Sequence, residues 1–212
     1  MSEPILRRYT NLASALHVIQ NRCLTLLSPT TWDDRNDAFY MGEYKRRKEA
    51  KSVLALCFAN APETYHHWRV FSHGSDGACI EFDRIRLKDA LPNDERIRAG
   101  SVNYKTISQA KSAHLGVDDL PFVKRFAFKD ESEFRVLYTG MNEVEESKQI
   151  QIPLSCISRI TLSPWLSSPL AGAVKNAIRS HKGCGKLKVF RSTLIENESW
   201  KQLGNPALKR PV

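Results

Sequence analysis

The sequence lacks the features that would tie it to an oxidising compartment or to a membrane. Its five cysteines are scattered, odd in number and free of any Cys-x-x-Cys pair, which argues against a disulfide framework and a zinc knuckle. No apolar run approaches the roughly 18 residues that span a bilayer. The N-terminus does not resemble a signal peptide, because two arginines follow Pro4 closely. We therefore expect a cytoplasmic protein with no membrane partner.

Several catalytic signatures are missing as well. The absence of Gly-x-x-x-x-Gly-Lys-Ser and Gly-x-Gly-x-x-Gly motifs disfavours kinase, NTPase and Rossmann classes. No Gly-x-Ser-x-Gly nucleophile elbow exists, and Cys57 and Cys79 lie in strand-like runs where thiols are usually inert. His66 and His67 are adjacent and face different sides of a helix, and His73 does not complete the i, i+4 spacing of helical zinc sites. We expect no metal site.

What remains is an ordinary globular composition. The chain has 212 residues, of which 42% are hydrophobic and 26% are charged, with nine phenylalanines and four tryptophans. Such a chain is long enough to bury a core without disulfides. In the absence of a repeat, a low-complexity block or a Pro/Gly-rich linker, we expect a single domain over residues 1–212.

Hydrophobic periodicity predicts an α+β fold, with mixed, mostly antiparallel sheet and flanking helices. Asn11 is expected to cap the first helix, and Tyr9 and Thr10 to lie where a first strand meets it. Strands are predicted at 24–27, 53–58, 78–82, 134–138, 149–152, 157–162 and 187–190. Helices are predicted at 38–51, 63–72, 108–114 and 169–181, with a loop over 30–37.

The formal net charge of +9 is concentrated near the C-terminus. Residues 171–212 hold nine Lys or Arg against two Glu, and Lys182, Lys186, Lys188 and Arg191 are the candidate contacts with a polyanion. A second basic run spans residues 45–48. A solvated helix face is the simple explanation of one such run. Two runs together favour nucleic acid or another phosphate-rich ligand.

The segment from Glu131 to Arg135 holds the most suggestive chemistry. On a strand, Glu131 and Glu133 would point to one face, where repulsion and burial can raise the pKa of one carboxyl. Such a pair suits acid–base catalysis or stabilisation of a cationic transition state. Arg135 would share that face and pair with Glu133. The alternative is a surface ladder of ion pairs with no catalytic role.

Two tryptophans are further candidates. Trp68, on a predicted helix, has core packing as its simplest explanation. Trp32 lies in a polar loop rich in Asp and Asn, where packing offers no ready explanation and where functional residues concentrate.

Several motifs, taken in order, resemble a bacterial family of unknown function, the domain family numbered 2971. They are Tyr9-Thr10, Ser28-Pro29, Trp32 to Phe39, Leu56-Cys57-Phe58, Gly77 to Asp83, Val102-x-Tyr104, Glu131-x-Glu133-Phe134-Arg135, Ile157-x-x-Ile160 and Val189 to Ser192. The match covers nearly the whole chain. It departs from the family at Ala38, where the family tends to have a proline.

The layout of that family is similar to the ADP-ribosyltransferase superfamily. This resemblance implies that Glu133 holds the ribose and stabilises an oxocarbenium-like transition state, and that Glu131 orients an acceptor. It further implies that Arg8, Tyr9 or Thr10 lines a pocket for NAD and that Trp32 or Trp68 stacks on a ring of NAD.

The leading hypothesis is thus an ADP-ribosyltransferase-like enzyme that uses NAD to modify a nucleic-acid or protein acceptor, as a toxin or antiphage effector. The first alternative is a non-catalytic nucleic-acid-binding or regulatory module. The second is a metal-dependent nuclease, which requires Asp33, Asp34 and Asp37 to converge.

Overall fold

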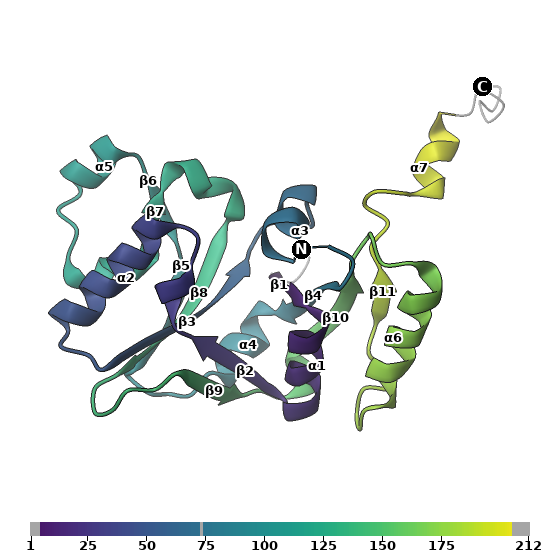
Figure 1. Ribbon diagram of the computed structural model, residues 1–212, viewed down its shortest axis with the longest axis horizontal. Helices are drawn as coiled ribbons and strands as arrows, with labels where there is room; N and C mark the ends of the chain where they lie inside the picture. Colours follow the sequence, from purple (N-terminus) through teal and green to yellow (C-terminus); the bar gives the residue numbers. More distant parts are fainter. Residues whose placement is uncertain (1–4, 73, 205–212) are drawn as a thin grey trace.

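A computed structural model describes residues 5–72 and 74–204 (Figure 1). The strands are β1 (Ile5–Asn11), β2 (Cys23–Leu27), β3 (Ser52–Ala59), β4 (Gly77–Asp83), β5 (Ile97–Ser101), β6 (Asn103–Lys105), β7 (Val123–Arg125), β8 (Glu133–Gly140), β9 (Ser147–Gln151), β10 (Ile157–Leu162) and β11 (Val189–Arg191). The α-helices are α1 (Leu12–Asn21), α2 (Arg35–Arg47), α3 (Tyr65–Phe71), α4 (Arg84–Ala90), α5 (Ile107–Ser112), α6 (Ser168–Ser180) and α7 (Glu198–Leu203). Four short 3-10 helices are η1 (Pro29–Thr31), η2 (Val117–Phe122), η3 (Phe126–Glu131) and η4 (Leu154–Cys156).

Nine strands form one mixed sheet, and β6 and β7 form a small parallel pair beside it. The main order is β11-β10-β4-β1-β3-β2-β9, with β8 and then β5 attached to β3. Every pairing in the large sheet is antiparallel except that of β10 with β11. The predicted α+β class with a mostly antiparallel sheet is therefore confirmed.

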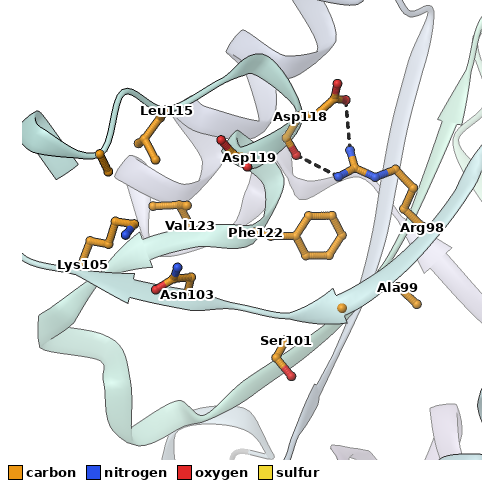
Figure 2. A pocket seen from close by; sticks show the side chains of 12 residues that line it. Arg98, Ala99, Ser101, Asn103, Lys105, Leu115, Asp118, Asp119, Phe122 and Val123 are labelled. Carbon is orange, nitrogen blue, oxygen red and sulfur yellow. Dashed lines mark hydrogen bonds and ion pairs between the residues drawn. The ribbon is translucent and has the colours of Figure 1, made fainter. Parts of the chain in front are cut away.

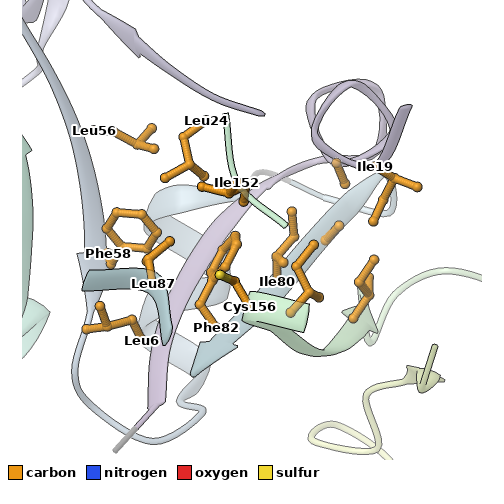
Figure 3. Packing of buried hydrophobic residues seen from close by; sticks show 14 of the residues in the cluster. Leu6, Ile19, Leu24, Leu56, Phe58, Ile80, Phe82, Leu87, Ile152 and Cys156 are labelled. Atoms are coloured by element: carbon orange, nitrogen blue, oxygen red, sulfur yellow. The ribbon is translucent and has the colours of Figure 1, made fainter. Parts of the chain in front are cut away.

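Alternation along the strands divides the sheet into two faces. One face carries the main apolar core, in which Leu6, Phe58, Ile80 and Phe82 are almost fully buried (Figure 3). Phe134 belongs to the same cluster. Helices α1, α4 and α6 contribute apolar side chains to this cluster. The opposite face carries two smaller apolar clusters. One lies under α2 and includes Ala55 of β3, and the other lies under α3 and includes Ala59 of the same strand.

Most predicted elements are present, and the first helix begins as expected, with the Asn11 side chain accepting from the Ser14 amide. The prediction of a loop over residues 30–37 is wrong for residues 35–37, which are helical. The Asp34 carboxylate accepts from the amides of Asn36 and Asp37, so α2 begins at Arg35 rather than Ala38. The placement of Glu131 on a strand is also wrong, because Glu131 ends η3 and Ser132 is left-handed, with φ of 46°.

Among the described residues, no helix combines the length and the apolar character needed to cross a bilayer.

Candidate functional site

A fork in the sheet opens a cavity at the edge of β3. Strand β8 pairs along the whole of β3, so β1 and β2 must both approach the other edge of β3. They meet it at two separate points, Arg7 beside Ala59 and Leu27 beside Ala55. Between these points the edge of β3 borders a cavity of about 430 Å³. Its size falls within the roughly 300–1,000 Å³ of small-molecule sites.

Small side chains leave room at the floor of this cavity. Residues 55–59 of β3 all border the cavity. Ala55, Cys57 and Ala59 alternate with Leu56 and Phe58, whose side chains belong to the apolar core of the other face. The register sets Arg135 opposite Cys57 and Glu133 opposite Ala59. The alternation of β8 therefore brings Glu133 and Arg135 to one face, as predicted, and Glu133 lines the cavity.

Arg135 is the centre of a buried ion cluster. Its guanidinium is 0% exposed and donates to both oxygens of Asp37, at 3.1 and 2.7 Å, and to Glu133 at 3.0 Å. A third acceptor is the carbonyl oxygen of Pro121, at 2.6 Å. Glu133 is only 6% exposed. The alternative of a surface ladder of ion pairs is therefore wrong.

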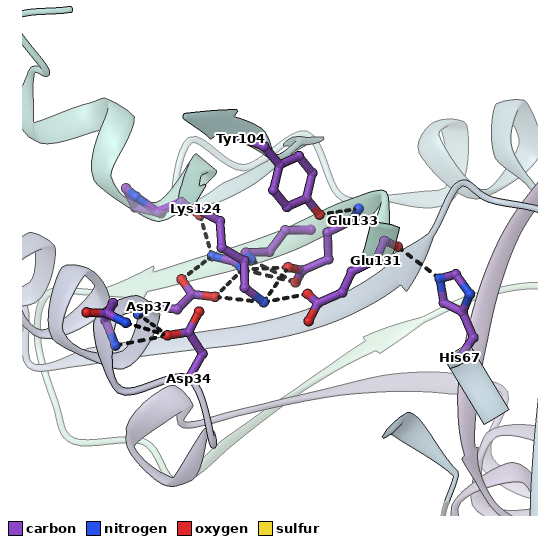
Figure 4. A network of polar contacts seen from close by, with 10 residues as sticks. Asp34, Asp37, His67, Tyr104, Lys124, Glu131 and Glu133 are labelled. Atoms are coloured by element: carbon purple, nitrogen blue, oxygen red, sulfur yellow. Dashed lines mark hydrogen bonds and ion pairs between the residues drawn. The ribbon is translucent and has the colours of Figure 1, made fainter. Parts of the chain in front are cut away.

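Lys124, on β7, is a member of the site that sequence reasoning missed (Figure 4). Its ammonium donates to Glu131 at 2.5 Å and to Glu133 at 3.3 Å, and lies 3.6 Å from Asp37. The Tyr104 hydroxyl accepts from the backbone amide of Glu133 at 2.8 Å. The small β6–β7 pair thus closes one side of the cluster.

The two glutamates differ in ionisation. Burial opposes the charge of Glu133, but Arg135 and Lys124 outweigh that penalty and lower the pKa of its carboxyl. Burial raises the pKa of Glu131, and its contact with Lys124 only partly offsets this effect. Two neighbouring carboxyls whose pKa values are displaced in opposite directions are typical of sites with one charged and one proton-exchanging group.

Arg8 faces the cavity from β1. Its guanidinium donates to the Cys57 carbonyl oxygen at 3.1 Å, across the fork, where the ladder of β3 is interrupted. Among the described residues, no carboxylate lies within 4.0 Å of it. Burial lowers the pKa of this guanidinium, and the negative charge of Glu133 opposes the shift. A partly buried cation without a close counter-ion is suited to an anionic ligand.

Of the other residues predicted to line an NAD pocket, some line the cavity and others do not. Tyr9 and Trp32 line the cavity, and the Arg135 guanidinium lies 4.7 Å from the centroid of the Trp32 ring. Thr10 is not among the lining residues. Trp68 is 0% exposed, packs edge-on against Tyr9 and donates from Nε1 to Glu63, so it is a core residue and its predicted stacking on NAD is wrong.

The C-terminal basic residues lie apart from the cavity. Lys182, Lys186 and Lys188 are exposed in the connection between α6 and β11, and Arg191 donates to the Pro164 carbonyl oxygen at 2.9 Å. Strand β11 is three strands from β1, about 14 Å at 4.8 Å per strand. The predicted nucleic-acid contacts therefore form no part of the cavity wall.

The three aspartates of the nuclease alternative all border the fork cavity but are not arranged as the ligands of one metal. Asp33 is exposed, Asp34 caps α2 and Asp37 is engaged by Arg135. In the part of the chain that the structure describes, no group of three or more His, Cys, Asp or Glu side chains has the arrangement of a metal site.

A second hollow, of about 450 Å³, lies near the β6–β7 pair (Figure 2). Lys105, Asn103 and Phe122 line it, and Arg98 spans one end by donating to the Asp118 side chain and backbone. Two of its four charged lining residues, Arg98 and Asp118, form an ion pair with each other, and none of the four is buried. The chemistry of the fork cavity is therefore the stronger candidate.

Comparison with known proteins finds only distant structural similarity. No protein-family model matches the chain, and no curated protein matches it. The resemblance to the family numbered 2971 thus stays a prediction.

Among solved structures, the chain is similar to DarT from Thermus sp. 2.9. For DarT in complex with NAD+, the TM-score is 0.47 and the identity 9%, over 91% of this chain and 96% of that one. The complex with carba-NAD+ gives a TM-score of 0.46 and 10% identity, over 91% and 97%. The complex with ADP-ribosylated ssDNA gives 0.48 and 8%, over 90% and 94%. At these values the similarity is remote and by itself decides neither activity nor ligand.

Proposed function

We propose that the fork cavity binds NAD and that the chain transfers ADP-ribose from it to an acceptor. The observation that supports this most is the buried Glu133 carboxylate, which faces the cavity and is held ionised by Arg135 and Lys124. A fixed negative charge in a water-poor wall stabilises positive charge that develops on a bound ligand. Cleavage of a glycosidic bond passes through such a cationic, oxocarbenium-like state.

The cavity also offers groups that match the parts of NAD. Arg8 supplies a cation without a close carboxylate for the diphosphate, and Trp32, Phe71 and Phe128 supply aromatic surface for the flat rings. Glu133 can accept hydrogen bonds from ribose hydroxyls. The proposed match thus rests on the charge, the aromatic surface and the hydrogen-bonding groups of the lining residues.

The two carboxyls have different roles in this reaction. The bond between C1′ of the ribose and the nicotinamide nitrogen breaks, and its electron pair leaves with neutral nicotinamide. Glu133 stabilises the cationic sugar, and an acceptor nucleophile forms the new bond at C1′. Glu131, whose carboxyl has a raised pKa, takes the proton that the acceptor loses.

The test compares two glutamine variants of arginine-paired glutamates. Glu133→Gln is expected to lower NAD turnover by about 100-fold to 1,000-fold, since it removes a charge aimed at the transition state. Glu81→Gln is the matched control, because Glu81 is buried and pairs with Arg7 and Arg159 but does not line the cavity. Turnover is followed by release of nicotinamide and by transfer of labelled ADP-ribose.

Wild-type protein that neither binds nor cleaves NAD would refute the proposal. Equal losses in the two variants would assign Glu133 a structural role. In that case the non-catalytic module remains, and the toxin or antiphage role, which we also propose, loses its basis.

A further inference from the structure

Helix α3 presents a stacked arginine at the surface. The Arg69 guanidinium lies 4.3 Å from the centroid of the Trp165 ring and 5.2 Å from that of Tyr65. Its Nε donates to the Tyr65 hydroxyl at 2.9 Å, and the two rings meet nearly edge to face, 5.8 Å apart. Tyr65 is 51% exposed. We call these three residues, Tyr65, Arg69 and Trp165, the α3 platform.

The charge of Arg69 is not neutralised within the described part of the chain. No carboxylate there lies within 4.0 Å of it, and its Nη atoms make no hydrogen bond to a described residue. Arg46 and Arg96, also exposed, pair with Glu43 and Asp94. Arg35 and Arg125 are exposed and form no ion pair, but they have no aromatic partner among the described residues. The platform therefore holds a planar cation in place by its rings while leaving its charge and donors available.

The platform adjoins the cavity. Val70, the next residue of α3, lines the cavity, and Trp165 packs against the cluster that contains Tyr9. On this side Arg7 and Arg159 both pair with Glu81, and Glu63 is a second carboxylate, which accepts from Trp68 Nε1 and from the Ser192 hydroxyl. The platform and the cavity therefore share helix α3, which contributes Arg69 to one and Val70 to the other.

We propose that the α3 platform binds single-stranded nucleic acid and delivers it to the fork cavity as the acceptor, an inference that rests on the function proposed above. Unpaired bases expose flat faces that stack on the Tyr65 ring and on the outer face of the Arg69 guanidinium, whose donors also bind phosphate oxygens. A duplex buries those faces.

The lysines of the α6–β11 connection are less suited to this role. Helix α6 has 13 residues and is about 20 Å long, and it separates the Trp165 loop from Lys182 (Figure 1). Those lysines carry positive charge but lack the aromatic partner that distinguishes bases from any other polyanion.

The experiment measures fluorescence anisotropy of a labelled oligonucleotide of about 16 nucleotides, as a single strand and as a duplex, without NAD. Tyr65→Ala combined with Arg69→Ala is expected to weaken single-strand binding by roughly 5-fold to 100-fold, the size of one lost stack. Duplex binding should change much less. The matched control is Ile85→Ala combined with Lys88→Ala, which removes an exposed apolar side chain and a charge from α4, against the opposite face.

Unchanged single-strand affinity in the platform variant would overturn the inference. Equal loss for single strand and duplex would overturn it too, since this would indicate a charge effect alone. Wild-type protein that binds no oligonucleotide would overturn the inference as well. NAD turnover by the wild type is measured separately, so a failure of the proposed reaction is distinguishable from a failure of this site.

Discussion

The two faces of strand β8 bury very different side chains. Phe134, Val136 and Tyr138 point into the apolar core, whereas Glu133 and Arg135 point into the ion cluster. Both sets are almost fully excluded from solvent. Burial of an apolar side chain stabilises the fold by about 1.5–3 kcal/mol. A buried ion pair contributes little net stability, because desolvation offsets the attraction between its charges.

This difference indicates that the apolar face holds the fold together and the polar face holds the site. A wall of aliphatic side chains in place of Asp37, Lys124, Glu133 and Arg135 would pack at no greater cost. Three members of the cluster, Asp37, Lys124 and Glu133, line the fork cavity, as the function proposed above requires.

The largest expected effect on stability comes from removing one member of the buried ion cluster. Arg135→Leu is expected to lower the free energy of unfolding by about 3–5 kcal/mol, because Asp37 and Glu133 stay buried without their main partner. Arg159→Leu serves as the control, since this side chain is 44% exposed and Glu81 keeps Arg7. That control should cost about 1 kcal/mol or less. Urea denaturation measures both, and equal costs would contradict the proposed division of the faces.

The second expected effect is on the pH dependence of stability. The pKa of Glu133 is lower in the folded protein than its ordinary value of 4.5, so its contribution is present above that value and is lost as the pH falls through the folded pKa. The stability difference between wild type and Glu133→Gln should therefore shrink below about pH 4.5. Phe58→Leu, on the apolar face, should show a difference that does not depend on pH in the same range. Parallel curves for the two variants would contradict the prediction.

A third test sharpens the comparison between a cavity tryptophan and a core tryptophan. Trp32→Ala should weaken NAD binding by about tenfold, since it removes both ring surface and the cation–π contact with Arg135. Trp68→Phe should leave NAD affinity within about twofold and lower the melting temperature, because Trp68 is core. Calorimetric titration and thermal unfolding separate the two results. A larger loss of NAD affinity in the Trp68 variant would reverse the assignment.

The smallest expected effect is that of reversing the charge of Lys182, Lys186 and Lys188. Because these side chains are exposed and lie outside the cavity wall, stability should change by about 0.5 kcal/mol or less. NAD turnover should be retained. Loss of all function in this variant, together with full function in Glu133→Gln, would favour the non-catalytic nucleic-acid module.

Sequence reasoning predicted part of the site because some relations are local. The period of two along a strand brings Glu133 and Arg135 to one face, and their ion pair follows from that period alone. The polar setting of Trp32 likewise marked a residue that lines the cavity. Trp68 shows the opposite case, since its chemistry suited a pocket but its helix packs it into the core.

Other parts of the site depend on contacts that no local pattern encodes. Asp37 reaches Arg135 across 98 residues of sequence, and Tyr104 reaches Glu133 across 29. Lys124 is close in sequence, but a 3-10 helix and a left-handed residue turn the chain so that its ammonium meets both glutamates. No periodic pattern in the sequence predicts η3 or the left-handed conformation of Ser132.

The sequence by itself determined the α+β class, most helices and strands, and the alternation that pairs Glu133 with Arg135. These follow from periodicity, capping and composition, which act over a few residues. Only the tertiary structure decided that β1 and β2 part at the edge of β3, that Arg8 and Glu133 face the resulting cavity, and that Lys124 joins the carboxylates. Such arrangements depend on the pairing of distant strands, and the buried charges are stable only where those pairings bring their partners within hydrogen-bonding distance.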